Sequence, residues 1–180
     1  MILAIDIGNT NIVIGCCADG QVIFRERVST NPTATVLEYA AMLKMAFDMN
    51  RADITAVDGA ILSSVVPAVT LTMRDAVHKY LHLTPLVVGP GIKTGLRIHI
   101  DNPAQLGSDL VVDAVAGIHH YPLPQIIIDM GTATTLVAMD KEGAMVGGAI
   151  VPGMGVSLDA LTQRAALLSS VSLEPPAHVV

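Results

Sequence analysis

Two short segments of the sequence combine aspartate, glycine and hydroxyl or amide side chains in the same order. They are Asp6-Ile7-Gly8-Asn9-Thr10-Asn11 and Asp129-Met130-Gly131-Thr132-Ala133-Thr134-Thr135. A glycine between strands lets a phosphate group approach the backbone, and the N–H groups and Asn or Thr side chains that follow can donate to its oxygens. The aspartate can hold a cation that offsets the phosphate charge. One such segment is usually a polar turn that ends a buried strand, but the pair predicts two loops that grip a nucleoside triphosphate.

Asp109 is a second candidate for chemistry, because it stands among apolar residues in a predicted helix. Those neighbours are Leu106, Leu110, Val111 and Val112. Aspartate is a poor residue for a helix interior, since its short side chain competes for backbone hydrogen bonds. Asp113 follows one turn later, and repulsion together with partial burial would raise a carboxylate pKa, which suits a general base acting on an alcohol. A solvated acidic stripe on an amphipathic helix explains the same residues equally well.

Hydrophobic periodicity and turn signals predict a mixed sheet with helices on its faces. Thr35-Val36-Leu37-Glu38 fits a capping box at the start of the first helix. Pro103, preceded by Asp101 and Asn102, predicts the start of the helix that carries Asp109 and that ends near residue 120. The predicted strands span residues 2–7, 12–17, 22–28, 57–62 and 86–88, and a further helix starts near residue 67.

The opening of the chain recurs later in the sequence. Asp129 lies 123 positions after Asp6, and the same offset carries Gly20 onto Gly143 without a gap. Recurrence of strand, turn, strand and hairpin predicts a duplicated domain, with the nucleotide between the two copies. The first domain is then residues 1–123 and the second is residues 124–180, which is only 57 residues. We therefore expect the second domain to be incomplete.

Composition excludes several classes of protein. The 180 residues carry a formal charge of −6 and are only 3 % aromatic, so neither a basic field nor stacking platforms are present for nucleic acid. With 52 % hydrophobic and 14 % charged residues, the chain is not disordered. The uncharged stretch 143–158 is too short and too rich in glycine to span a membrane, and Asp6 interrupts any signal peptide. We expect a soluble cytoplasmic protein.

Along its whole length the sequence resembles the type III pantothenate kinases. The matching motifs, besides the two Asp-x-Gly segments, are residues 63–67 (Ser-Ser-Val-Val-Pro), 85–91 (Pro-Leu-Val-Val-Gly-Pro-Gly), 101–103 (Asp-Asn-Pro), 107–109 (Gly-Ser-Asp) and 147–153 (Gly-Gly-Ala-Ile-Val-Pro-Gly). This family belongs to the superfamily of acetate kinases, sugar kinases and actin. The resemblance implies an α/β fold of duplicated ribonuclease-H-like domains of the actin-like ATPase type, with mixed sheets and a truncated second domain.

The resemblance also implies roles for single residues. Asp109 matches the proton acceptor that deprotonates the pantothenate hydroxyl, and Asp129 matches a ligand of a monovalent cation, potassium or ammonium. The residues that match ATP contacts are Asp6, Ile7, Gly8, Asn9, Thr10, Asn11, Ile12, Val13 and Thr132, and those that match the substrate motif are Gly107, Ser108, Asp109 and Leu110. The implied reaction converts ATP, with Mg²⁺, and pantothenate to ADP and 4′-phosphopantothenate, in a homodimer.

Three departures from the family pattern bear on activity. Leu110 stands where the family has Arg, and leucine cannot replace a planar donor fork. Ile100 stands where the family often has Tyr, and the next family motif would begin just after Val180. A non-catalytic relative that keeps the nucleotide fold is therefore an alternative to the kinase. Another superfamily kinase, for a sugar or a short acid, fits the two loops but not the helix at Gly107.

Overall fold

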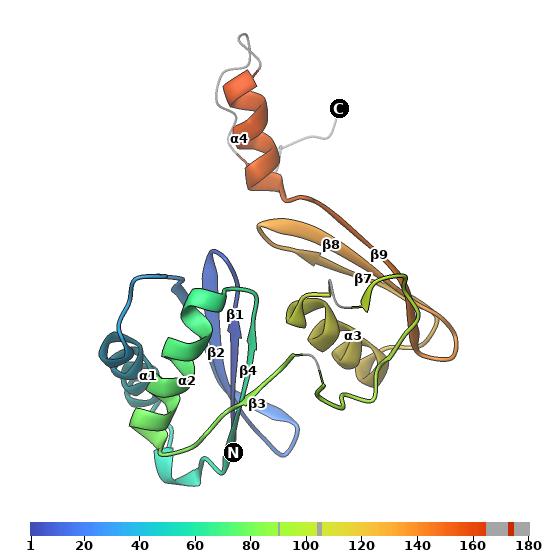
Figure 1. Ribbon diagram of the computed structural model, residues 1–180. Coiled ribbons are helices and arrows are strands. Elements are labelled where there is room, and N and C mark those ends of the chain that lie inside the picture. Colours follow the sequence, from blue (N-terminus) through green and yellow to red (C-terminus); the bar gives the residue numbers. More distant parts are fainter. Residues whose placement is uncertain (90, 104–105, 165–172, 175–180) are drawn as a thin grey trace.

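The computed structural model describes residues 1–89, 91–103, 106–164 and 173–174 (Figure 1). They form two β-sheets with helices packed against them, the mixed α/β arrangement that the sequence predicts. The first sheet contains, in spatial order, β3 (Gln21–Ser29), β2 (Asn11–Ala18), β1 (Ile2–Ile7), β4 (Gly59–Ser64) and β5 (Leu86–Val87). β1 is antiparallel to β2 and parallel to β4, so the first sheet is mixed.

Helices α1 (Val36–Asn50) and α2 (Pro67–Leu81) cover one face of this sheet (Figure 1). α1 begins at the predicted capping box: the Thr35 hydroxyl accepts from the Glu38 N–H, and the Glu38 carboxylate accepts from the Thr35 N–H. A short 3₁₀ helix, η1 (Ile54–Ala56), connects α1 to β4. Alternate residues of β1 pack beneath the two helices, so this face of the sheet forms the main hydrophobic core.

The second sheet contains, in spatial order, β6 (Arg97–Ile98), β9 (Ala144–Pro152), β8 (Ala133–Met139) and β7 (Gln125–Met130). β7, β8 and β9 form an antiparallel meander, and β6, which the sequence does not predict, pairs parallel with β9. Helix α3 (Ser108–His120) packs on this sheet, where Leu110 and Ala114 join a smaller core with Val137, Met139 and Met145. α3 therefore shares its hydrophobic core with the second sheet.

α3 lies between the two sheets (Figure 1), since its other side faces the first sheet and Val112 lines a cleft there together with Ala4 and Ile61. Both β6 and α3 precede residue 123 in the sequence and yet pack with the second sheet. The division of the chain into domains at residue 123 therefore stays a prediction from the repeat.

The sequence predicts that α3 begins at Pro103, but the helix begins at Ser108. Its N-cap is Gly107, in extended backbone conformation, and Asp101 and Asn102 do not cap it. Gly107 supplies no side-chain cap, but within the first turn the Asp109 carboxylate accepts a hydrogen bond from the Leu110 N–H at 2.8 Å and so satisfies one of the N–H groups that a helix start leaves free.

α4 (Met154–Arg164) follows β9 and extends away from both sheets (Figure 1). The sequence does not predict this helix, and none of its residues is buried. Across the described part of the chain, no helix combines the length and the apolar character that crossing a membrane needs.

The structure repeats together with the sequence. The bounds of β7 and β9 are those of β1 and β3 plus 123 residues. The two hairpin glycines, Gly20 and Gly143, also share a backbone conformation, with φ of +73° and +75°. The strand between them is shifted by 122, because Asp6 pairs with Val13 whereas Asp129 pairs with Thr135. The turn before β8 is one residue shorter than the turn before β2, and β8 itself is one residue shorter than β2. The hairpin loop that follows is two residues longer, 140–143 against 19–20. The gap-free offset expected from the sequence thus holds at both ends of the unit but not through its middle strand.

Candidate active site

The first Asp-x-Gly turn connects β1 and β2 and is held by backbone hydrogen bonds. The Gly8 N–H donates to the carbonyl of Asn11 at 2.9 Å, and a Cβ on Gly8 would lie 3.1 Å from that same oxygen. Thr30, just after β3, fastens the turn from outside: its hydroxyl donates to the Gly8 carbonyl at 2.7 Å and its N–H to the Thr10 carbonyl at 2.9 Å. The polar residues of the turn are therefore carried on a fixed backbone.

The second turn, between β7 and β8, is fastened in the same way. The Gly131 N–H donates to the Ala133 carbonyl, and the Gly153 N–H donates to the Thr132 carbonyl, each at 3.0 Å. A Cβ on Gly153 would lie 2.2 Å from the Gly131 carbonyl oxygen, so only glycine fits this position. The end of β9 therefore packs directly on the second turn.

The two turns meet across one cleft, as the paired motif predicts. The hydroxyl oxygens of Thr10 and Thr132 lie 2.7 Å apart, within hydrogen-bond distance. The cleft has a volume of about 460 Å³ and is lined by Asp6, Ile7, Gly8, Asn9, Thr10, Asn11, Val13, Arg27, Val65, Asp109, Asp129, Met130, Gly131, Thr132, Ala133 and Thr135. Of the predicted ATP contacts only Ile12 is absent from this lining, because its side chain is fully buried in the core under α1 and α2.

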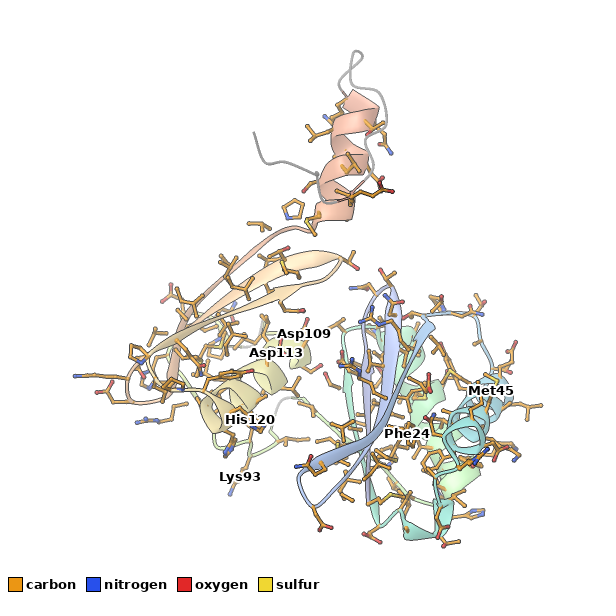
Figure 2. All side chains as sticks on the ribbon, turned by 180° about the vertical axis from the view of Figure 1, so that it is seen from behind. Phe24, Met45, Lys93, Asp109, Asp113 and His120 are labelled. Carbon is orange, nitrogen blue, oxygen red and sulfur yellow. The ribbon has the colours of Figure 1, made fainter. Side chains whose placement is uncertain are left out.

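Asp109 reaches the same cleft from the first turn of α3. Figure 2 shows Asp109 at the end of α3 that faces the first sheet and Asp113 one turn further along the helix. A helix N-terminus stabilises a carboxylate through its free N–H groups and its dipole. Gly107 leaves room for this carboxylate, because a Cβ at this position would lie 2.2 Å from the Asp109 Oδ1 and the carboxylate would have to shift. The sequence Gly-Ser-Asp thus provides both the helix start and the space for the carboxylate.

Negative charge accumulates in and beside the cleft. Burial raises the pKa of Asp6, a hydrogen bond with Ser63 acts in the opposite direction, and the charges of Asp109 and Asp129 raise it further. Burial also raises the pKa of Asp113 to about 6, and the charges of Asp129, Asp109 and Asp6 contribute in that order. Such mutual repulsion favours the binding of a cation, which removes it.

The arrangement of carboxylates fits a metal ion that arrives with its ligand rather than a closed metal centre. Among the residues with described positions, no three Asp, Glu, His or Cys side chains are grouped closely enough to hold an ion by themselves. Mg²⁺ keeps several waters and commonly binds one or two carboxylates together with substrate phosphates. Asp6 and Asp129 line the cleft from opposite turns and supply the oxygen ligands that such an ion, or a monovalent cation, prefers.

The residues of the substrate motif face three different clefts. Asp109 lines the cleft of the two turns, whereas Gly107 and Ser108 line a neighbouring cleft of about 510 Å³ that shares Val65 with it. Leu110 lines a third cleft of about 460 Å³, together with Ile100. The two substitutions within the family pattern, Leu110 and Ile100, therefore line the same cleft.

Several residues at the site received no role from the sequence reasoning, although the ranges 63–67 and 147–153 were noted there as matching the family. Arg27 and Val65 line the cleft, Thr30 and Gly153 fasten the turns, and Ser63 contacts Asp6. A signal for two of them was available, since Thr30 and Gly153 are separated by the same 123 positions as the two aspartates. Arg27 and Ser63 reach the site only through strand pairing, because Val13 pairs with Arg27 and Asp6 with Ser63.

Comparison with solved structures places the chain in a known fold. An activator of 2-hydroxyisocaproyl-CoA dehydratase from Clostridium difficile, with bound ADPNP, superposes with a TM-score of 0.53 at 14 % identity, over 90 % of this chain and 51 % of that one. A Ppx/GppA phosphatase from Aquifex aeolicus gives 0.51 at 16 % identity, over 90 % and 54 %. These likenesses concern the fold alone, and they confirm the predicted actin-like ATPase and sugar-kinase fold.

Comparison with sequences identifies the family. The family model described as type III pantothenate kinase matches residues 2–180. The type III pantothenate kinase of an Exiguobacterium species is 46 % identical over 180 residues, which is all of this chain and 71 % of the relative, and that of Pelobacter propionicus is 44 % identical over the same shares. Because the family model and these relatives cover the chain from end to end, the chain belongs to the type III pantothenate kinase family.

Proposed function

We propose that the protein transfers the γ-phosphoryl group of ATP to pantothenate, giving ADP and 4′-phosphopantothenate, the first step towards coenzyme A. Family membership supports the choice of substrate. One geometric observation carries the mechanism: both Asp-x-Gly turns and Asp109 line a single cleft, although the first turn stands more than a hundred positions before Asp109 and the second turn in the sequence. A triphosphate between the turns would present its last phosphate to the alcohol that Asp109 activates.

The two turns would bind the phosphates through backbone N–H groups and through short donors. Asn9, Thr10 and Asn11 supply amide and hydroxyl groups on the first side, and Thr132 supplies a hydroxyl on the second. Since phosphoryl transfer needs mainly positioning and neutralised charge, fixed donors on both sides of the phosphates would contribute most of the catalysis. The hydrogen bonds from Thr30 and Gly153 would keep these donors in place without ligand.

Asp109 would act as the general base. Its carboxylate accepts the proton of the pantothenate hydroxyl as the hydroxyl oxygen bonds to the γ-phosphorus. The bond from that phosphorus to the bridging oxygen breaks, and ADP leaves with the electron pair. A positioned general base contributes about a hundred- to ten-thousand-fold to the rate.

Asp6 and Asp129 would hold the cations: Mg²⁺ together with the ATP phosphates, and potassium or ammonium at Asp129. When bound, the cations offset the charge of the triphosphate and of the surrounding carboxylates. Burial first, and then the charges of the neighbouring aspartates, raise the pKa of Asp6, and a cation bound there would offset both effects, which supports this assignment. We expect turnover to drop sharply when sodium replaces potassium, and equal rates in both salts would remove the monovalent cation from Asp129.

The test of the proposed function uses the complete natural protein that contains this sequence, because the chain spans 71 % of the length of its curated relatives. ADP release is measured with ATP, Mg²⁺, potassium and pantothenate. We expect turnover that needs pantothenate and that falls at least about a hundredfold in Asp109→Asn. Asp75→Asn is the matched control, since Asp75 is an exposed helical aspartate that forms an ion pair with the neighbouring Arg74. ATP binding without pantothenate-dependent turnover would contradict the proposal.

The family resemblance further supports a homodimer, which sedimentation of the complete protein would test.

For the location in the cell we propose the cytoplasm. The free thiols of Cys16 and Cys17 support a reducing compartment.

A further inference from the structure

Ser108 stands next to the proposed base, but its side chain is engaged with β4. The hydroxyl accepts hydrogen bonds from the Ser64 N–H at 3.0 Å and from the Ser63 hydroxyl at 3.1 Å, and it donates to the Ser64 carbonyl at 3.0 Å. A hydroxyl has one proton to donate and two lone pairs to accept with. These three bonds therefore use its full capacity and leave none for a substrate.

The Ser108 hydroxyl bonds to the backbone of Ser64 where a neighbouring strand would otherwise do so. β5 pairs with β4 at Ile61 and Leu62, and the Val88 N–H donates one further bond to the Leu62 carbonyl at 2.7 Å. Two residues further along, the N–H and the carbonyl of Ser64 both bond to the single hydroxyl of Ser108. Ser108 thus takes the place of the next strand residue. Without it, two half-buried backbone groups would lose their partner.

The position of Ser108 connects the two halves of the site. The body of α3 packs on the second sheet, where Leu110 and Ala114 lie in the smaller core. Within the described residues, Ser108 is the residue of α3 whose side chain hydrogen-bonds to the first sheet. Ser63, one of its partners, is buried and pairs in register with Asp6 on β1. The contact therefore fixes the start of α3 at the level of the first aspartate.

We propose that Ser108 is a positioning residue: its hydroxyl holds the first turn of α3 on β4 and thereby fixes the Asp109 carboxylate opposite the first phosphate loop. This rests on the proposed kinase function, in which Asp109 is the base. Ser108 acts through Asp109 alone and touches neither ATP nor pantothenate with its side chain. Small displacements of a catalytic group cost large factors in rate, so the loss of this contact lowers kcat rather than affinity.

The first test compares Ser108→Ala, Ser108→Thr and the control Thr55→Ala in the complete protein. Thr55 also uses its hydroxyl in a local hydrogen bond, to Asp53, but lies on η1 far from the cleft. We expect Ser108→Ala to lower kcat about tenfold and to leave the KM for ATP within about twofold. Ser108→Thr, which keeps the hydroxyl, retains most of the wild-type kcat, and Thr55→Ala is unchanged. Unaltered kcat in Ser108→Ala, measured per folded enzyme, overturns the proposal.

A second comparison separates positioning from general stability. Since Ser108 acts through Asp109, Ser108→Ala should cause no further loss of kcat when it is added to Asp109→Asn. A further loss as large as the loss in the wild-type background overturns the proposal.

Amide hydrogen exchange provides a readout that does not need turnover. The Ser64 N–H should exchange at least about tenfold faster in Ser108→Ala than in the wild type, because its acceptor is gone. If the wild-type protein shows no pantothenate-dependent ADP release, the proposed function fails, and faster exchange at Ser64 still supports the contact. Unchanged exchange at Ser64 overturns the inference whether or not the enzyme turns over.

Discussion

The two strand–turn–strand units of the molecule reach the same local geometry with different residues. In the first, the N–H of Thr30 donates to the Thr10 carbonyl, and in the second the N–H of Gly153 donates to the Thr132 carbonyl. The first unit uses a threonine whose hydroxyl adds a bond to the turn, whereas the second uses a glycine that lets the strand end touch the turn. Each turn is therefore held by its own strand ends.

The units differ in what covers their sheets. Leu3, Ile5 and Ile7 of β1 are 0 %, 3 % and 0 % exposed beneath α1 and α2, whereas the positions 123 residues later, Ile126, Ile128 and Met130 of β7, are 68 %, 57 % and 73 % exposed. Within the described residues no helix packs over this face of β7. The same turn thus forms on a covered and on a bare sheet, which indicates that turn geometry is local and that stability depends on the cover.

The sharpest test of this difference makes one substitution in both units. Ile5→Ala removes a buried side chain from a packed core and should lower the free energy of unfolding by about 2–5 kcal/mol. Ile128→Ala removes the equivalent side chain from a largely exposed position and should cost less than about 1 kcal/mol. Urea unfolding of the 180-residue chain, followed by circular dichroism, measures both. Equal losses would contradict the comparison, because they would mean that Ile128 is covered in solution.

The sequence predicts those parts of the fold that depend on neighbouring residues in the chain. The strands of the first unit, the capping box at Thr35 and Glu38, and both hairpin glycines depend on neighbours in the sequence, and the structure contains them. The predicted start of α3 was wrong: Pro103, after Asp101 and Asn102, carries the usual signal of a helix start, but the helix begins at Ser108 behind Gly107, which supplies no side-chain cap. A local capping signal thus fails where the helix starts without a capping side chain.

The candidate site was predicted in its principal residues and not in its contacts. Asp6, Asp109 and Asp129 come together as expected from two turns and one helix. The pairing of Ser63 with Asp6 and the bonds from Ser108 to Ser64 depend on which strands lie side by side, and no spacing within one segment encodes that. The sequence comparison does not reveal the one-residue shift of β8. The shorter turn before β8 and the longer hairpin loop after it offset each other, so the spacing of 123 residues is restored at Gly143.

Charge provides a second comparison of the units, since Asp113 on α3 feels the aspartates of both turns. Its pKa is raised to about 6, and the charge of Asp129 contributes more than that of Asp6. We therefore expect Asp129→Asn to lower the pKa of Asp113 more than Asp6→Asn does. NMR titration of the Asp113 carboxyl carbon measures the shifts, with Asp75→Asn as a control that leaves the titration unchanged. A larger effect of Asp6→Asn would contradict the comparison.

The same group makes stability depend on pH. The folded pKa of Asp113, about 6, lies above the ordinary aspartate value of 3.8, so the folded state binds more protons between about pH 4 and pH 6. The contribution of Asp113 to stability is present below this window and is lost as the pH rises through it. Asp113→Asn should therefore gain roughly 1 kcal/mol at pH 7 relative to the wild type, since water screens a half-exposed carboxyl, and nothing at pH 4. Urea unfolding at both values measures the difference.

The smallest expected effect concerns the side-chain contact that joins the two turns, the hydrogen bond between the Thr10 and Thr132 hydroxyls. Both residues are exposed, so water replaces the bond when it breaks, and the coupling in a double-mutant cycle of Thr10→Val and Thr132→Val should be about 0.5 kcal/mol or less without ligand. With an ATP analogue between the turns, each hydroxyl would donate to phosphate, and the coupling should vanish while each single variant weakens binding. A coupling above about 1 kcal/mol without ligand would mean that the turns hold each other rather than being held by their own strand ends.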